Sequence, residues 1–564
     1  MRVGGGHRSE SADLVVVALI SVICLVPFVY KAFHVDDTLF LWAARQIQLN
    51  PTDFYGFTAN WYGREMPMSL ITRNPPLNSY FLAGAAWFFG WSELALHLAF
   101  LVIALALGLG TYFLAARMGT QGVLAVALMV VTPAFLVSST NVMCDTLMLA
   151  LYVWTVVVWS RGLAEDRWLL LMGGAILASL AALTKYHGMT LVPLLAAYSL
   201  VAKRRVGTWA LFLVVPVGVF IAYECLLHSL YGAGVIADAA SWAATKSVRD
   251  LHHFALRTLI GLSFTGGSLI SVAFFAPLLW SRKTLAVGGL LVGLVAAALV
   301  LVGNIGLRPA QDSPWVQWGL VLQMSIFVVA GIHVLALAVT DITARRDADS
   351  LMLFLWTFGT FVFGGIFNWT TNVRSLFPMA PAAGILVARR LDLLAGEVMP
   401  RSRWAVLAPL LLAACCSMAV AWADFSLANC QKVAAQSIAG SQQAKTGKLW
   451  FQGHWGFQYY MQSLGASPVD FHSSQFKAGD VMVIPMGNAS LREPRADWFE
   501  QISEYECMPC RWVTTSQRRL SAGFYSDGWG WLPFAFGPVE AERFLIFRAT
   551  RGIDVAPNDR QIPR

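Results

Sequence analysis

Long apolar segments alternate with short polar turns along most of the chain. The segments that we predict to cross a membrane are 13–33, 92–116, 121–138, 142–160, 168–184, 187–202, 208–231, 258–280, 285–305, 318–340, 351–368, 376–395 and 404–424. A run of about 20 apolar residues crosses a bilayer, and it is helical because lipid offers no partner to free backbone groups. The pattern predicts a mostly α-helical, polytopic membrane protein with about 13 transmembrane helices.

The positions of the basic residues predict the topology. If the N-terminus lies in the cytoplasm and the first segment is a retained signal anchor, the basic clusters beside short turns all lie inside, as the positive-inside rule requires. These clusters are Arg117, Arg161–Arg167, Lys203–Arg205, Arg282–Lys283, Arg345–Arg346, and Arg401 with Arg403. We therefore predict an integral protein of the plasma membrane, which in bacteria is the inner membrane.

One shorter apolar segment, 76–90, does not fit this alternation as a span. It is only about 15 residues long, and segments of this length are often interfacial or re-entrant. Counting it as a span would place the later basic clusters outside. We therefore predict an interfacial helix over 76–90, after a first outer loop over 34–75. Pro75 and Pro76 suit its start, because proline is tolerated in the first turn of a helix.

The last part of the chain, 425–564, has a mixed polar pattern. Val481–Pro485 and Phe544–Phe547 have the pattern of buried strands. We therefore divide the chain into a membrane domain, 1–424, and a small α/β or α+β domain, 425–564, on the extracytoplasmic side. Cys507 and Cys510 have redox-motif spacing without the expected βαβ context. A structural disulfide is favoured outside the cytoplasm, and whether these two cysteines pair with each other stays open.

Composition supports the membrane assignment and argues against a nucleic-acid partner. Apolar residues make up 57% of the 564 residues and charged residues 13%, whereas a soluble protein carries about a quarter charged residues. The net charge of +8 is explained by the basic cytoplasmic turns.

Three acidic residues lie at predicted outer turns. Asp36 and Asp37 follow the first apolar segment, and Asp145 lies between two later ones. Carboxylates at a membrane face are costly, so they often mark a working site. One acid of the pair can act as a general base while the other orients it, or the two can bind a metal. The alternatives are a solvated helix end for the pair, and for Asp145 an acid that favours the helix dipole.

Cations are scarce on the outer side, and three of them are candidates for binding a phosphate. They are Lys185, Arg374 and Arg73, the last of which comes just before Asn74 and the predicted interfacial helix. The free N–H groups of a helix N-terminus also attract anions. The alternative for each is a side chain that extends to the lipid headgroups.

Further residues are candidates for substrate binding because they combine aromatic or polar groups with these turns. They are Asn74, Tyr186, His187, His454 and Trp455. Aromatic faces with a few polar groups suit sugars, and they also suit packing at a membrane interface. No convincing set of metal ligands is present. A divalent metal cofactor is therefore left open.

The order of these residues resembles the GT-C membrane glycosyltransferases of the protein O-mannosyltransferase and lipid A aminoarabinose transferase group. The resemblance covers about 1–425 and rests on Asp36-Asp37, Asp53-Phe54-Tyr55-Gly56, Asn74-Pro75-Pro76-Leu77, Thr132-Pro133, Asp145, Thr184-Lys185, and Arg374 with Pro378 and Pro381. It implies that Asp36 is the essential acid of the first outer loop and that Lys185 lies near the carrier phosphate. Two positions depart from the family pattern: Asp37 replaces a glutamate, and Asn74 replaces a lysine.

The resemblance implies an inverting transfer of a sugar from a polyprenyl-phosphate donor to an extracytoplasmic lipid, glycan or protein acceptor. Asp36, Asp37 and Asp145 would then be catalytic, and the cations would stabilise the charge on the leaving phosphate. The competing interpretations are a transporter or flippase of a lipid-linked sugar, a ligase that moves a whole glycan, and a non-enzymatic assembly protein. A transporter would place its ions near the bilayer midplane and show internal repeats.

Overall fold

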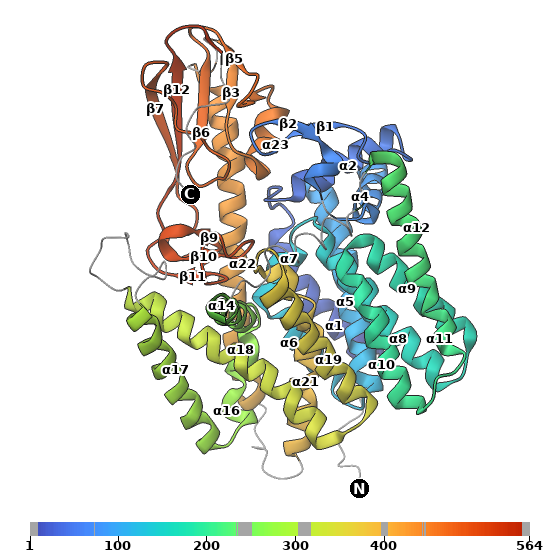
Figure 1. Cartoon of the computed structure of the whole chain (residues 1–564). Helices are drawn as coiled ribbons and strands as arrows, with labels where there is room; N and C mark the ends of the chain where they lie inside the picture. Colours follow the sequence, from blue (N-terminus) through green and yellow to red (C-terminus); the bar gives the residue numbers. More distant parts are fainter. Residues whose placement is uncertain are drawn as a thin grey trace.

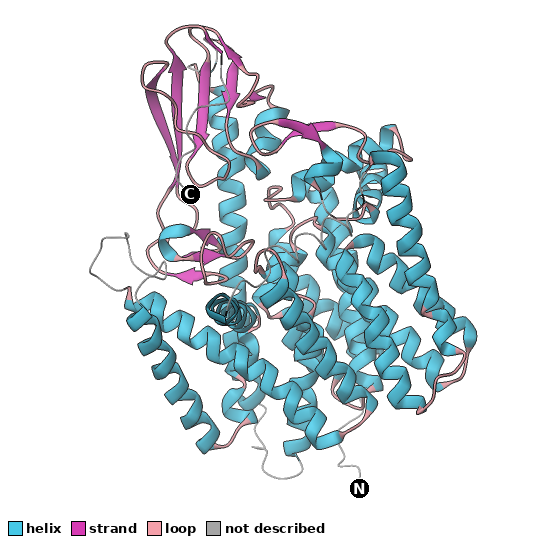
Figure 2. Ribbon diagram, in the orientation of Figure 1, coloured by secondary structure: helices cyan, strands magenta, loops and turns pink. Residues whose placement is uncertain are grey.

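The computed structural model describes residues 10–72, 74–232, 234, 251–302, 317–395, 404–442, 444 and 447–554. A bundle of helices forms the larger part of the molecule, and a β-sheet lies beyond one end of it (Figures 1 and 2). A single long helix, α22 (Trp404–Gly440), runs from the bundle to the sheet (Figure 1).

Eight helical stretches among the described residues are long and apolar enough to cross a membrane. They are Glu10–Phe28 (α1, Glu10–Leu25, with the 3-10 turn η1, Val26–Phe28), α5 (Glu93–Arg117), α8 (Cys144–Ala164), Trp209–Tyr231 (α11, Trp209–Phe212, and α12, Val214–Tyr231), Arg282–Leu301 (in α17, Arg282–Val302), α18 (Trp318–Arg345), Ala348–Phe367 (α19, Ala348–Thr360, and the π-helix η3, Phe361–Phe367) and α22. A ninth is obtained if α6 (Gly122–Val130) and α7 (Pro133–Ser139), which meet at 70°, are counted as one broken span. The chain is thus an integral membrane protein, and the predicted count of thirteen spans is not confirmed.

The remaining predicted spans correspond to shorter or interrupted helices. These are α9 (Trp168–Thr184), η2 (Tyr186–Thr190) with α10 (Leu191–Lys203), the series α14 (Leu251–Ser268), α15 (Ile270–Phe274) and α16 (Ala276–Leu279), and α20 (Val373–Leu376) with α21 (Met379–Ala395). Most of the predicted apolar segments are therefore helical, but several are too short or too bent to count as spans by length alone.

The first outer loop and the segment that follows it are folded into short elements at the sheet-side end of the bundle (Figure 1). They are α2 (Asp37–Leu49), the antiparallel pair β1 (Thr58–Asn60) and β2 (Glu65–Pro67), α3 (Met68–Ile71) and α4 (Leu77–Phe89). Helix α4 matches the predicted interfacial helix, and Gly90, with φ of 84°, ends it. Its last three residues, Trp87, Phe88 and Phe89, are at least 70% exposed, as suits a helix that lies in an interface.

The sheet of the C-terminal part has five strands in the order β4-β3-β6-β12-β7. They are β3 (Leu449–Phe451), β4 (Ser467–Pro468), β6 (Val481–Pro485), β7 (Phe499–Cys507) and β12 (Glu542–Ala549); β3 is parallel to β4 and β6, and β12 is antiparallel to β6 and β7. Helix α23 (Trp455–Ser463) follows β3, and the small pair β5 (Gln475–Phe476) and β13 (Ile553–Asp554) completes this part. One face of the sheet packs with α23 against the first outer loop in a shared apolar core.

A second C-terminal unit lies between the sheet and the helix bundle (Figure 1). It spans residues 510–539 and is called the docking segment below; it contains β8 (Val513–Thr514), β9 (Ser516–Gln517), η5 (Arg518–Leu520), β10 (Ala522–Gly523) and β11 (Ala535–Phe536). Its buried side chains, among them Phe524 and Phe534, belong to the same apolar core as the membrane helices. The C-terminal part is thus packed directly into the bundle, and α22 runs across the division that we predicted after residue 424.

A disulfide joins the sheet to α22. It links Cys430 to Cys507, which are 77 residues apart in sequence, whereas Cys510 is a free, buried cysteine. The redox-motif spacing of Cys507 and Cys510 therefore does not reflect a bond between them.

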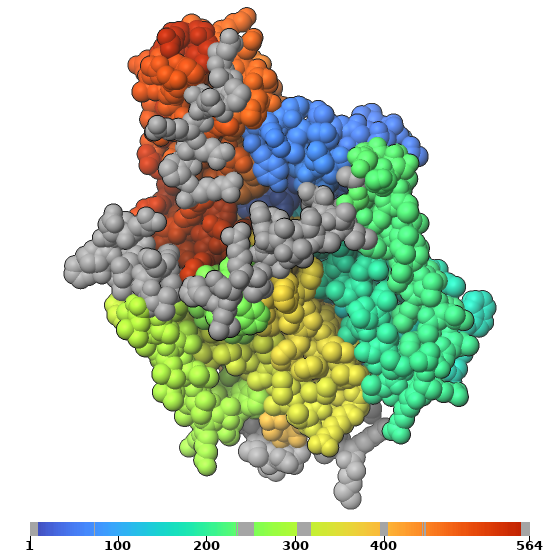
Figure 3. Space-filling view, in the orientation of Figure 1, coloured from blue at the N-terminus to red at the C-terminus, as the bar shows by residue number. Residues whose placement is uncertain are grey.

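Charged side chains lie at both ends of the bundle. The ends near the sheet carry Asp145, at the start of α8, and Lys185, just after α9. The opposite ends carry cations such as Arg117 on α5 and Lys203 on α10, which pair with Asp349 and Asp166. In the space-filling view the first outer loop and the sheet lie beside each other above the bundle (Figure 3).

Candidate active site

Asp36 and Asp37 are adjacent in sequence, but their carboxylates face different surroundings. Asp37 is fully buried at the start of α2. Its Oδ2 accepts the backbone N–H of His34 at 2.8 Å, and its Oδ1 accepts that of Val142 at 2.9 Å. Burial raises the pKa of Asp37 to about 7, and the two N–H groups oppose that shift. Asp37 therefore holds together the loops that carry the site.

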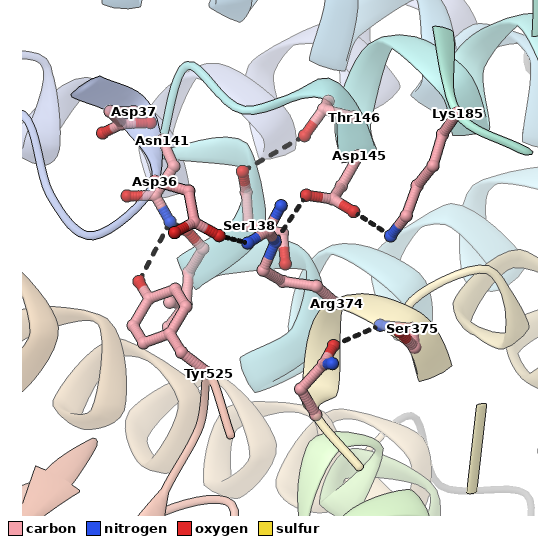
Figure 4. Close-up of polar contacts among 12 residues, drawn as sticks. Asp36, Asp37, Ser138, Asn141, Asp145, Thr146, Lys185, Arg374, Ser375 and Tyr525 are labelled. Atoms are coloured by element: carbon pink, nitrogen blue, oxygen red, sulfur yellow. Dashed lines mark hydrogen bonds and ion pairs between the residues drawn. The ribbon is translucent and has the colours of Figure 1, made fainter. Parts of the chain in front are cut away.

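The Asp36 side chain is 34% exposed and forms an ion pair with Arg374. Its Oδ2 accepts Nη1 of Arg374 at 2.7 Å. Arg374 lies in α20, a short helix whose start is capped by Asn372, with Oδ1 accepting the backbone N–H of Ser375 at 2.9 Å. The cap fixes the turn from which the guanidinium extends toward Asp36 (Figure 4).

Asp145 connects Arg374 to Lys185. Its Oδ2 accepts Nε of Arg374 at 2.8 Å, and its Oδ1 accepts Nζ of Lys185 at 2.6 Å. The four side chains form a row, Asp36–Arg374–Asp145–Lys185, that contains two negative and two positive charges (Figure 4). The Asp145 side chain is 2% exposed and that of Arg374 10%, whereas Lys185 reaches 18%. Solvent therefore reaches the row mainly at its two ends, Asp36 and Lys185.

The residues near Lys185 and Asn74 pack into the protein. His187 is buried in η2, with its ring against those of Tyr152 and Phe363 at 5.9 and 5.8 Å. The Tyr186 ring packs against Phe220 at 5.5 Å.

Asn74 is placed through its main chain. Its carbonyl accepts the hydroxyl of Tyr55 at 2.6 Å. Arg73, the third predicted phosphate ligand, lies outside the described residues, so its role stays a prediction.

His454 and Trp455 lie where the sheet meets the first outer loop. The buried His454 ring packs on Trp61 at 4.6 Å, and burial lowers its pKa to about 3. Trp455 has φ of 67°, a region that non-glycine residues rarely adopt. Its carbonyl accepts the hydroxyl of Thr38 at 3.0 Å, and its ring contacts Trp529 at 5.5 Å. The bond to Thr38 places Trp455 at the first turn of α2, two residues after Asp36.

A buried charged cluster next to the site did not emerge from the sequence. Lys31 is fully buried, and its Nζ contacts Oδ2 of Asp424 at 2.5 Å and Oδ1 of Asn141 at 2.6 Å. Asp424 also accepts the hydroxyls of Thr515 at 2.8 Å and Tyr525 at 2.9 Å. The sequence does contain a signal for this cluster, because Lys31 and Asp424 are charged residues within predicted membrane segments.

The described part of the chain offers no cluster of metal ligands. Among the residues that the structure describes, no group of three or more His, Cys, Asp or Glu side chains is arranged to hold a metal ion. In the row of four residues, both oxygens of Asp145 are already bound by cations.

Comparison with known proteins agrees with the predicted resemblance. Residues 73–228, less than half of the chain, match the model of the dolichyl-phosphate-mannose-protein mannosyltransferase family. Among solved structures, ArnT from Cupriavidus metallidurans bound to undecaprenyl phosphate is similar with a TM-score of 0.50 at 14% identity, over 85% of this chain and 94% of that one. No curated protein sequence matches the chain.

Two longer proteins are also similar. The Archaeoglobus fulgidus oligosaccharyltransferase matches with a TM-score of 0.49 at 15% identity, over 81% of this chain. The mycobacterial arabinofuranosyltransferase AftD matches with a TM-score of 0.41 at 12% identity, over 99% of this chain. The chain spans 63% of the length of the oligosaccharyltransferase and 41% of that of AftD.

The fold is similar to that of the GT-C membrane proteins. The resemblance to GT-C membrane glycosyltransferases is confirmed by the family model and by the fold shared with ArnT. These similarities support a glycosyltransferase.

Proposed function

We propose that the protein is a membrane glycosyltransferase that moves a sugar from a polyprenyl-phosphate donor to an extracytoplasmic lipid, glycan or protein acceptor. The observation that carries this proposal is the row of charges at one end of the bundle. A partly exposed carboxylate, Asp36, lies next to a guanidinium that is linked through Asp145 to the amine of Lys185. Transfer from a phosphate needs these two kinds of group close together.

Asp36 is the proposed general base. Of the three predicted acids it has the most exposed side chain, and within the described part of the chain only its Oδ2 is bound by another side chain. Its Oδ1 would take the proton from the acceptor hydroxyl or amide as the acceptor attacks the sugar. Asp37 supports it indirectly, because both Asp37 oxygens bind backbone N–H groups.

Lys185 and Arg374 are the proposed groups that stabilise the leaving phosphate. A polyprenyl-phosphate sugar is a phosphodiester with one negative charge, and breaking its bond to the sugar leaves a phosphomonoester that gains a second. Cations held in advance stabilise such a developing charge most effectively. Asp145 would hold both cations in place, since each of its oxygens binds one of them. Arg73 would join them at the start of the interfacial helix.

This mechanism displaces the phosphate in one step, so it inverts the configuration at the sugar carbon. The similar ArnT structure contains undecaprenyl phosphate, which supports a polyprenyl-phosphate carrier here. The proposed topology has thirteen spans, with the N-terminus in the cytoplasm and the site, the sheet and the docking segment outside the inner membrane.

The activity test uses purified protein in lipid nanodiscs with radiolabelled polyprenyl-phosphate sugars and candidate acceptors. We expect label in the acceptor with wild-type protein and at least about tenfold less with Asp36→Asn. The same protein in sealed vesicles tests the alternative. Movement of the lipid-linked sugar across the bilayer without transfer would favour a flippase and contradict the proposal.

The sidedness has a separate test. Ala478 is exposed beside the sheet, and Ala164 is exposed at the opposite end of the bundle. In a background without other exposed cysteines, Ala478→Cys should react with a membrane-impermeant maleimide in intact cells, and Ala164→Cys only after permeabilisation. The reverse pattern would contradict an extracytoplasmic site.

A further inference from the structure

The docking segment reaches the candidate active site through two successive residues. Phe524 and Tyr525 lie between β10 and the turn that begins at Ser526. Each contacts a different part of the site. Neither residue has a part in the proposed transfer reaction so far, and the role inferred for them rests on that proposed function.

Phe524 contacts the part that carries Arg374. Its carbonyl accepts the backbone N–H of Val373 at 2.9 Å. Val373 is the first residue of α20, and the N–H groups of a first helical turn have no partner within the helix. Phe524 is itself fully buried, and its own N–H donates to the carbonyl of Thr515 at 2.8 Å. The start of α20, one residue before Arg374, is therefore fixed from the docking segment.

Tyr525 contacts the part that carries the acids. Its hydroxyl accepts Nδ2 of Asn141 at 3.0 Å (Figure 4). The same hydroxyl donates to Oδ2 of Asp424 at 2.9 Å. The residue after Asn141 is Val142, whose N–H binds Asp37. The turn that anchors Asp37, and through it Asp36, is thus bound by the phenol.

The buried charges keep this phenol in place. Asp424 binds Lys31 at 2.5 Å and the hydroxyl of Thr515 at 2.8 Å, and Lys31 in turn binds Asn141 at 2.6 Å. All four groups are buried. A satisfied buried network of this kind is stiff, because breaking any contact leaves a polar group without a partner.

We propose that Phe524 and Tyr525 are positioning residues that fix Arg374 and Asp36 relative to each other across the site. Asp36 and Arg374 come from segments 338 residues apart, and no helix joins them directly. The docking segment supplies that connection, with its main chain on the side of Arg374 and its phenol on the side of the acids. A misplacement of about 1 Å between reacting groups can lower a rate by as much as about 10²-fold.

The test compares Tyr525→Phe with wild type in the transfer assay. The substitution removes the hydroxyl and keeps the ring, while Asp424 keeps Lys31 and Thr515. We expect kcat to fall by about tenfold, with the KM for the donor within about twofold, because geometry and not donor contact is lost. Tyr505→Phe is the matched control, since its hydroxyl also joins the C-terminal part to α22, through Ser437 at 3.4 Å. It should retain wild-type kcat.

A double-mutant cycle separates positioning from general packing. In Arg374→Lys the contact to Asp36 is already altered, so adding Tyr525→Phe should lower kcat by less than about threefold. An equal fall in both backgrounds, or wild-type kcat in Tyr525→Phe alone, would overturn the inference. If Tyr525→Phe does not yield folded protein, Thr515→Val loosens the same network and carries the same expectation. Wild-type protein without any transfer activity would overturn the proposed function instead.

Discussion

Asp36 and Arg374 form a 2.7 Å ion pair between the first outer loop and a short helix that begins 337 residues later in the chain, at Val373. The pair is not isolated, because Arg374 uses a second nitrogen, Nε, to bind Asp145. One guanidinium therefore sets the separation of two carboxylates that come from different parts of the chain.

Replacing Asp36 by asparagine should abolish most of the transfer activity. The amide keeps the size of the side chain but cannot take a proton from the acceptor, and a general base contributes about 10²–10⁴-fold to a rate. We expect kcat to fall by more than about tenfold in the nanodisc assay, with an unchanged thermal unfolding midpoint. Asp53→Asn is the control, since Asp53 lies in the same loop and binds Tyr231 at 3.0 Å. Near-wild-type turnover in Asp36→Asn would reject Asp36 as the base.

Replacing Lys185 by alanine should weaken donor binding more than acceptor binding. Its amine is bound to Asp145 at 2.6 Å and is 18% exposed, so it can also reach a phosphate. Charge-assisted contacts to phosphate are stronger than neutral ones. Titration with a donor analogue should show at least about tenfold weaker binding. Lys203→Ala removes a similar 2.6 Å pair, with Asp166, at the opposite end of the bundle and should bind normally. Equal affinities for both variants would remove Lys185 from the site.

Replacing Arg374 by lysine should impair the enzyme although the charge is kept. Lysine has one compact cationic head and cannot reproduce the two separate contacts that Nε and Nη1 make. We expect kcat to fall by about tenfold or more. Arg345→Lys, in a 3.3 Å pair with Asp341 far from the site, is the control. Full activity in Arg374→Lys would show that only the charge matters at this position.

Breaking the disulfide should destabilise the sheet without exposing the membrane helices. The bond closes a loop of 77 residues, and disulfides typically contribute about 2–4 kcal/mol. Cys507→Ser should lower the thermal unfolding midpoint and increase proteolysis within 447–554. Cys510→Ser, at a free cysteine, should not do so. Peptide mapping of the unreduced wild type checks the pairing directly, and a Cys507–Cys510 peptide would contradict it.

Acidification should destabilise the contact between the sheet and the first outer loop through His454. Burial holds the folded-state pKa near 3, whereas an unfolded histidine titrates near 6.5. The unfolded chain therefore binds more protons as the pH falls below about 6.5, so stability is lost toward acid and is fully present above that value.

Comparison of unfolding midpoints at pH 7 and pH 5 tests this. The midpoint of His454→Phe should fall less than that of wild type, because phenylalanine keeps the packing on Trp61 and cannot take a proton. The bonds between Asn488 and the main chain of His454 remain. The exposed His472→Phe serves as the control. Identical acid shifts in all three proteins would exclude His454 as the group responsible.

The sequence predicted most of the helices and singled out the four residues of the row as candidates, because both leave local signals. Apolar runs identify helices without any knowledge of their partners, and Asp36, Asp145, Lys185 and Arg374 were each unusual at an outer turn. The different surroundings of Asp36 and Asp37 were not predictable, since they depend on which backbone N–H groups and cations approach each carboxylate.

Long-range pairing was also beyond the sequence pattern. Lys31 and Asp424 are 393 residues apart, and each by itself has the appearance of a charge at the end of an apolar segment. Cys430 pairs with Cys507 because α22 and β7 run side by side, which spacing does not reveal. The docking segment has the composition of a small β-rich domain, so its burial among the membrane helices depends on the tertiary fold.

Helix α22 is one continuous rod of 37 residues, about 55 Å long at 1.5 Å per residue. It carries Asp424 beside the site and Cys430 at the sheet, six residues further along. Because the disulfide ties the sheet to α22, a tilt of the sheet must also move the helix that carries Asp424. A force applied to the sheet would therefore reach the contact between Asp424 and Lys31 and, through Asn141, the turn whose next residue, Val142, binds Asp37.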